Sequence, residues 1–80
     1  MWGKLMKQSF KIFMTVAEEL SIVKAAKRSF VTQQCVSDHI KRLEEEYGVL
    51  LFNRKPHLSL TEAGEVMFQY LRSTKILESN

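Results

Sequence analysis

A run of polar side chains begins at Gln33 and continues through Gln34, Ser37, Asp38 and Lys41. Glutamine can pair bidentately with adenine, aspartate can accept a hydrogen bond from the cytosine amino group, and serine can donate or accept. If one helix presents these side chains outward, they predict contact with base edges in a DNA groove. A solvated helix face needs the same residue types, so that alternative stays open.

Basic residues gather in the same half of the chain. Residues 1–43 carry eight Lys or Arg and three Asp or Glu, whereas residues 44–80 carry four and six, which gives a net charge of +3. A one-sided basic region is the footprint expected for a polyanion partner, although a solvated face is again the alternative. The densest group surrounds Asp38 and comprises Lys24, Lys27, Arg28, Lys41 and Arg42.

Residue types used in catalysis and metal binding are sparse. Cys35 and His39 are spaced to share one helical face, as two metal ligands or a nucleophile and its base would. The sequence has no second Cys, and its other histidine, His57, is distant, so we expect no metal, no cofactor and no enzymatic activity. A phosphate-binding loop is not expected either, because the glycines are isolated at Gly3, Gly48 and Gly64.

The 80 residues suffice for one small domain. A chain of this length buries only about 60–65% of its unfolded surface, so a partner subunit would add stability. Its longest apolar run, residues 49–52, is too short to cross a membrane, and early lysines argue against a secretory signal. The single cysteine indicates a reducing compartment. We therefore expect a cytoplasmic protein with no membrane partner.

Apolar residues at helical intervals predict four helices to position these side chains, over residues 6–20, 22–29, 33–47 and 62–78. A short second helix, a tight break and a longer third helix match a helix-turn-helix, whose second helix enters the major groove. We expect the acidic run at residues 44–46 to form a solvated last turn. The expected caps are Ser21, Thr32 and Thr61 at helix N-termini and Gly48 at a C-terminus.

Between the third and fourth helices, residues 51–52 and 58–60 flank a turn that contains Pro56, which predicts a two-stranded hairpin. The helix 62–78 has a broad apolar stripe that leaves Phe68 outside it. We expect Tyr70, Leu71 and Leu77 to lie beyond the reach of so small a core. We therefore expect a dimer seam made by Val66, Met67, Tyr70, Leu71 and Leu77.

Over about residues 6–75 the chain resembles the LysR-type transcriptional regulators. The motifs that carry the resemblance are Ala25-Ala26, Val31-Thr32-Gln33, Ser37, Ile40, Arg42-Leu43-Glu44, Gly48, Leu51-Phe52, Arg54 and Leu60-Thr61-Glu62-Ala63-Gly64. The resemblance implies a mostly α-helical fold, with a winged helix-turn-helix at 5–61 and a linker helix at 62–80. The helix-turn-helix would occupy about 21–47 and the wing about 49–60. It also implies bacterial transcription control by a homodimer that binds double-stranded DNA.

The resemblance places DNA contacts on individual residues. Thr32, Gln33 and Ser37 match contact positions at the start of the recognition helix. Arg54 matches the arginine of the wing, and Thr61 matches a helix-capping threonine near the DNA backbone. The expected contact set is completed by Lys24, where the family often has a basic phosphate contact, and by Gln34, Asp38, Lys41 and Lys55.

Two departures alter the expected DNA-reading surface. Gln34 stands where the family usually has Pro or Ser, and Asp38 stands where Arg is frequent. A carboxylate near phosphate is repelled, so Asp38 must face a base donor, pair with a neighbour such as Lys41 or Arg42, or weaken binding.

Two further departures concern packing. Ser29 replaces a usual core leucine, which costs stability unless Phe30 or another side chain fills the space. The wing is about one residue shorter than the common form and has Pro56 in place of a glycine turn.

The leading hypothesis is sequence-specific DNA binding as a dimer. The alternative is a truncated regulator that acts as a protein-interaction module and heterodimerises through residues 62–78, which Asp38 and the short wing favour. Family members usually continue into an effector-binding domain that these residues do not include, so we expect no small-molecule effector for this chain.

Overall fold

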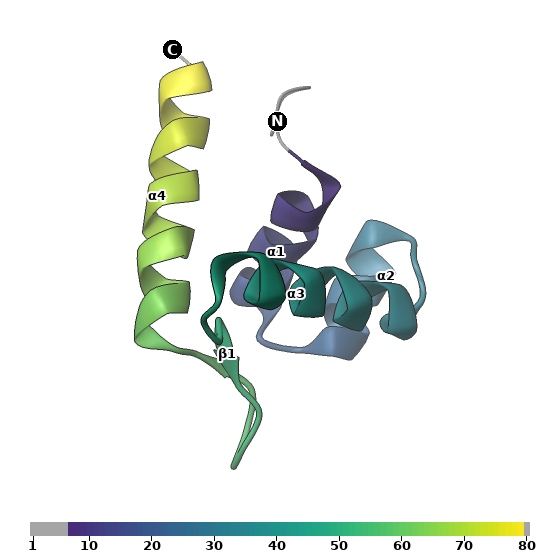
Figure 1. Ribbon diagram of the computed structural model, residues 1–80. Coiled ribbons are helices and arrows are strands. Elements are labelled where there is room, and N and C mark those ends of the chain that lie inside the picture. The colour runs from purple at the N-terminus through teal and green to yellow at the C-terminus, as the bar shows by residue number, and fades with distance from the viewer. Residues whose placement is uncertain (1–6, 80) are drawn as a thin grey trace.

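A computed structural model describes residues 7–79, with side chains described as far as residue 73. Four helices and a two-stranded sheet follow one another along the chain (Figure 1). The fourth helix lies along one side of the body that the first three form (Figure 1). The elements are α1 (Gln8–Glu19), α2 (Ile22–Ser29), α3 (Gln33–Tyr47), β1 (Phe52–Asn53), β2 (Ser59–Leu60) and α4 (Glu62–Ser79).

The predicted helix-turn-helix is confirmed, because α2 and α3 have the predicted bounds and caps. The hydroxyl of Ser21 accepts a hydrogen bond from the Lys24 amide at 3.1 Å, and the hydroxyl of Thr32 accepts one from the Cys35 amide at 3.0 Å. Each bond satisfies an amide that has no partner within its helix. Gly48 ends α3 with a φ of 70°, which glycine adopts without steric cost.

The connection between α2 and α3 includes a residue with a positive φ, a backbone conformation that non-glycine residues seldom adopt. Phe30 follows α2 in the left-handed region, with a φ of 58°, and its side chain is 94% exposed. It therefore does not fill the space beside Ser29, which excludes one of the two alternatives raised for that position. The left-handed backbone of Phe30 instead turns the chain after α2. Its amide donates hydrogen bonds to the carbonyls of Ala26 and Lys27.

The core lies where α1, α2 and α3 cross, and the wing closes one end of it. Val36, Ile40 and Leu43 are fully buried on the inward face of α3. The rings of Phe13 and Phe52 lie 5.4 Å apart, which brings the first strand of the wing against α1. The apolar stripe of α3 thus turns inward and leaves its polar face toward solvent.

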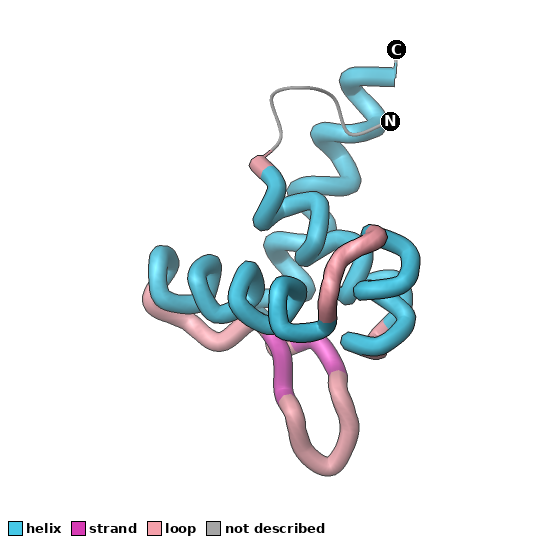
Figure 2. The backbone as a smooth tube through the Cα atoms, turned by 90° about the vertical axis from the view of Figure 1, so that its right-hand side faces the viewer, coloured by secondary structure: helices cyan, strands magenta, loops and turns pink. Residues whose placement is uncertain are grey.

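The wing is an antiparallel hairpin in which Phe52 pairs with Leu60 and Asn53 with Ser59. It projects beyond the helices as a narrow loop (Figure 2). This confirms the predicted hairpin. Its strands are two residues each, so most of the loop that carries Arg54 and Lys55 stands free of the core.

The start of α4 is fixed against the wing. The Thr61 hydroxyl donates to the Leu50 carbonyl at 2.6 Å and accepts from the Gly64 amide at 3.0 Å, which confirms Thr61 as a cap. A Cβ on Gly64 would overlap the carbonyl oxygen of Leu51, so only glycine permits this close approach. No helix in the described part of the chain is long and apolar enough to cross a bilayer.

The first half of α4 belongs to the core, which corrects two expectations. Leu71 is 5% exposed and packs in the buried cluster, so it is within reach of its own core. Phe68, expected outside the apolar stripe, also packs against that cluster. The core that the first three helices form therefore extends onto the first half of α4.

Candidate nucleic-acid interface

The polar face predicted on α3 is present at the N-terminal end of that helix. Gln33, Gln34 and Asp38 are exposed, Ser37 is half-buried, and Lys41 continues the face one turn further on. α3 is about 22 Å long, a length that fits along the major groove. The structure thus brings all five predicted base-reading candidates onto one helix surface.

Asp38 has a partner that the sequence did not indicate. Its Oδ1 accepts a hydrogen bond from Nε2 of Gln34 at 3.0 Å, one turn earlier on the same face. Of the three alternatives raised for Asp38, the pairing with Lys41 or Arg42 is not formed, because none of the ion pairs among the described residues includes Asp38. The neutral amide of Gln34 and the carboxylate of Asp38 therefore form a hydrogen-bonded pair on the polar face.

The basic group around this face divides into free and neutralised members. Arg28 makes ion pairs of 2.9 Å with Glu18 and Glu19, and these hydrogen bonds raise the pKa of its guanidinium. It therefore contributes little to attraction of a polyanion, which corrects its place in the predicted cluster. Around this face, the exposed cations that make no ion pair within the described residues are Lys24, Lys27, Lys41, Arg42 and Lys55.

Arg54 is tied loosely to α3. Its guanidinium lies 3.8 Å from Oε1 of Glu44, and its side chain is 49% exposed. Oε2 of Glu44 also accepts hydrogen bonds from the backbone amides of Leu51 and Phe52, at 2.9 and 3.3 Å. The side chain of Glu44 is only 11% exposed, so Glu44 anchors the wing. The expectation that it belongs to a solvated last turn is therefore wrong.

The two threonines of the expected contact set both act as helix caps. The hydroxyl of Thr32 is engaged by Cys35, which leaves the amides of Gln33 and Gln34 at the positive end of the α3 dipole. The hydroxyl proton of Thr61 is donated to Leu50. Thr61 thus holds the start of α4 in place and has no hydroxyl proton to give a phosphate.

His39 lies at the back of the polar face. Its Nδ1 is 2.9 Å from Oγ of Ser9, and this half-buried contact ties α3 to α1. The spacing of Cys35 and His39 would allow a shared site, although we expected none, and the structure gives the histidine a serine on another helix. Within the described residues, no three His, Cys, Asp or Glu side chains gather closely enough to hold a metal ion.

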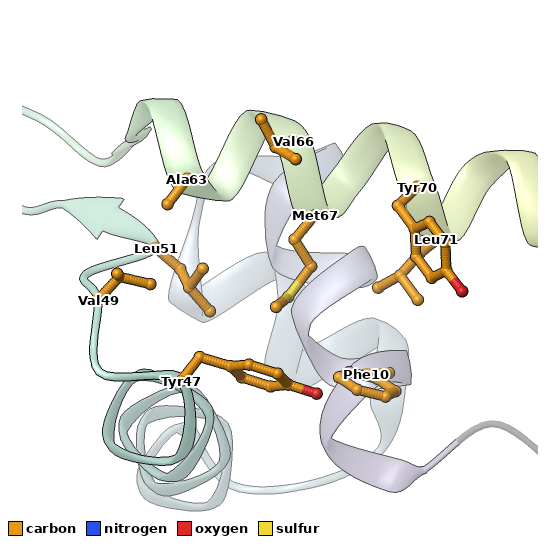
Figure 3. A pocket seen from close by; sticks show the side chains of 9 residues that line it. All are labelled: Phe10, Tyr47, Val49, Leu51, Ala63, Val66, Met67, Tyr70 and Leu71. Atoms are coloured by element: carbon orange, nitrogen blue, oxygen red, sulfur yellow. The ribbon is translucent and has the colours of Figure 1, made fainter.

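An apolar groove lies on another part of the surface, between α1, the end of α3 and the first half of α4. Its volume is about 720 Å³. Met67 points from α4 toward the rings of Phe10 and Tyr47, while Tyr70 borders the groove (Figure 3). The lining residues are Phe10, Tyr47, Val49, Leu51, Ala63, Val66, Met67, Tyr70 and Leu71.

The predicted dimer residues differ in how they contribute to this groove. Val66 and Tyr70 are 66% and 69% exposed, so most of each side chain lies at the surface. Met67 is half-buried, and Leu71 is buried in its own subunit. Leu77 lies within α4, but its side chain falls outside the described residues.

Sequence reasoning missed two residues that shape the site. Glu44 was hidden because it is one of three consecutive glutamates, and only its packing distinguishes it from Glu45 and Glu46. The role of Gly64 in the contact between α4 and Leu51 was missed as well. No signal in a single sequence identifies either residue, since both roles depend on backbone brought in from the wing.

A helix-turn-helix with a polar face on its second helix, followed by a hairpin that projects beside it, defines a winged helix-turn-helix DNA-binding domain. A family model described as bacterial regulatory helix-turn-helix protein, lysR family, matches residues 8–65. The chain therefore belongs to the LysR family and holds the DNA-binding domain of these transcriptional regulators.

Two curated relatives come from Bacillus subtilis (strain 168). The HTH-type transcriptional regulator AlsR is 49% identical over 61 residues, which cover 75% of this chain and 20% of the regulator. The HTH-type transcriptional regulator CysL is 42% identical over 60 residues, which cover 74% and 20% respectively. The chain thus spans about a fifth of the length of these relatives.

Solved structures agree with this assignment. The complex of the CbnR DNA-binding domain with DNA matches with a TM-score of 0.82 at 32% identity, covering 92% of this chain and 87% of that one. The complex of the BenM DNA-binding domain with catB site 1 DNA matches with a TM-score of 0.81 at 33% identity, covering 92% and 80%. Both relatives were solved with DNA bound.

Proposed function

We propose that this chain binds double-stranded DNA sequence-specifically and so regulates transcription, with α3 in the major groove and the wing on the adjacent backbone or minor groove. The observation that carries the proposal is the polar N-terminal face of α3, bordered by lysines that make no ion pair within the described residues. The likeness to two DNA-bound domains supports this orientation. We place this activity in the bacterial cytoplasm and propose no catalytic step.

The proposed contacts divide into two classes. Lys24, Arg54 and Lys55 would bind phosphates and so set affinity, because a phosphate contact carries no sequence information. Gln33 and Ser37 would contact base edges from the polar face of α3. Of the predicted contacts, Thr61 would act through the backbone that it caps, since its hydroxyl proton is donated to Leu50. The Thr32 hydroxyl accepts from the Cys35 amide and keeps its proton, so it could donate to a phosphate.

We also propose that the chain acts as a homodimer through α4. The support is the apolar groove beside Val66 and Tyr70, since a monomer rarely leaves such a patch open to solvent without a use for it. A two-fold axis through this seam would place two α3 helices on two half-sites. The bound sequence would then be a pseudo-palindrome.

The experiment that tests the function is a binding selection. The purified chain is mixed with a pool of random duplexes at about 0.15 M salt, and the bound DNA is sequenced; the salt matters because phosphate contacts weaken steeply with it. We expect an enriched site with two-fold symmetry. A folded, dimeric sample that enriches no sequence would contradict the proposal and would favour the alternative, heterodimerisation with a longer regulator through α4.

A further inference from the structure

The hydrogen bond between Gln34 and Asp38 sits where a recognition helix meets the bases. Nε2 of Gln34 donates to Oδ1 of Asp38 at 3.0 Å, and both side chains are exposed on the face that carries Gln33. The two residues are four positions apart, which places them on the same side of α3. A glutamine that precedes an acidic side chain by one turn is a favourable helix pair. The contact is therefore expected to persist in solution.

The bond leaves a defined set of groups free. Nε2 of Gln34 has a second proton, and its Oε1 has no hydrogen-bond partner among the described residues. One donor beside one acceptor in a fixed plane is the arrangement that matches N7 and the N6 amino group of adenine. An unpaired glutamine must lose rotamer freedom to adopt this arrangement, whereas Gln34 is already held in place by Asp38.

Asp38 keeps its second oxygen for a different base. An ionised carboxylate only accepts hydrogen bonds, and in the major groove the amino group of cytosine offers a donor that suits it. Against the acceptor atoms of guanine, or against a phosphate, the same charge is repelled. The rise between positions 34 and 38 is about 6 Å, on the order of two base-pair steps.

We propose that Gln34 and Asp38 act as one reading unit, in which Asp38 positions the Gln34 amide for adenine and itself selects a cytosine within two base pairs. The inference rests on the proposed DNA-binding function and specifies its sequence preference. It also accounts for an acidic side chain on a basic surface, because the carboxylate discriminates against sites that lack the cytosine.

The test repeats the binding selection with the wild-type chain and with Asp38→Ala, Asp38→Asn and Gln34→Ala. For the wild type we expect an adenine and a cytosine within two base pairs in each half-site. Asp38→Ala should lose the cytosine preference, reduce discrimination for adenine by about tenfold, and bind unselected DNA more tightly. Asp38→Asn keeps an oxygen acceptor for Gln34, so it should restore the adenine preference without the repulsion.

Glu45→Ala is the matched control, since it removes one exposed carboxylate from the same side of α3, about 10 Å further along the helix axis than Asp38. It should leave both base preferences unchanged. A second measurement needs no DNA: the side-chain amide resonances of Gln34 should shift in Asp38→Ala and stay in place in Glu45→Ala.

The outcomes separate the two proposals. If the wild type enriches a site and Asp38→Ala keeps both preferences, the reading unit is overturned while the DNA-binding function stands. If Gln34→Ala keeps the adenine preference, the assignment of adenine to Gln34 is overturned. If the wild type enriches no sequence, the proposed function fails and this inference fails with it.

Discussion

Lys24 and Arg28 lie one turn apart on α2 and carry the same charge, yet the structure gives them different uses. Arg28 is held by Glu18 and Glu19, whereas the side chain of Lys24 is exposed and makes no ion pair with any described residue. A cation that is already paired releases few counterions when DNA approaches, while a free one at a phosphate releases about one. The two residues therefore offer a matched comparison.

Lys24→Ala should weaken binding to all duplexes alike and lower the slope of log affinity against log salt by about 1. Arg28→Ala should leave that slope nearly unchanged, because Glu18 and Glu19 balance its charge. Binding titrations at several salt concentrations give both slopes. Equal slopes for Lys24→Ala and the wild type would remove Lys24 from the phosphate contacts.

At the scale of elements, one carboxylate joins α3 to the wing. The carboxylate of Glu44 accepts hydrogen bonds from the backbone amides of Leu51 and Phe52 and lies near the guanidinium of Arg54. These bonds fix the direction in which the hairpin leaves the core, although β1 and β2 are only two residues long. The wing is thus positioned less by its own pairing than by the helix that it flanks.

Glu44→Ala should lower the free energy of unfolding by about 1–3 kcal/mol, because it leaves half-buried amides without an acceptor. Glu44→Gln keeps an oxygen acceptor and loses only the charge, so its cost should be smaller. Urea unfolding followed by circular dichroism measures both. Glu45→Ala, on the exposed neighbour, should stay within about 0.5 kcal/mol of the wild type, and an equal loss there would argue against the anchor.

At the scale of the whole molecule, the proposed DNA-reading face and the apolar groove occupy different surfaces. The first lies on α3 and the wing, and the second lies between α1, the end of α3 and α4. Within α4, Leu71 packs in the core and also lines the groove, whereas the exposed Val66 and Tyr70 border the groove alone. The proposed dimer can therefore form without covering the residues that would read DNA.

Val66→Lys should dissociate the proposed dimer, because it places a charge in an apolar seam, while the 66% exposure of Val66 in the single chain lets the fold tolerate the change. Analytical ultracentrifugation should show a monomer. Affinity for a two-fold site should fall by about 100-fold, since the two half-sites are then bound independently.

Gln69→Lys supplies the control for this change, since it adds the same charge to an exposed position on α4 that does not line the groove. It should remain dimeric and keep its affinity. If Val66→Lys also sediments like the wild type, the seam lies elsewhere.

Much of the fold follows from the sequence alone. The bounds of α2 and α3 and their caps are set by apolar residues and hydroxyls a few positions apart, and such interactions are complete within one or two helical turns. The outward polar face of α3 follows as well. The apolar stripe on the opposite side of the helix must be buried in the core, so the polar side faces solvent.

The tertiary structure alone decided which distant groups meet. Arg28 pairs with Glu18 and Glu19, Ser9 with His39, and Glu44 with the wing amides. Leu71 reaches the core because Gly64 lets the start of α4 approach the backbone of Leu51 closely. Each of these contacts depends on the angle and distance at which two separate elements pack. The spacing of residues along one element does not determine that angle or that distance.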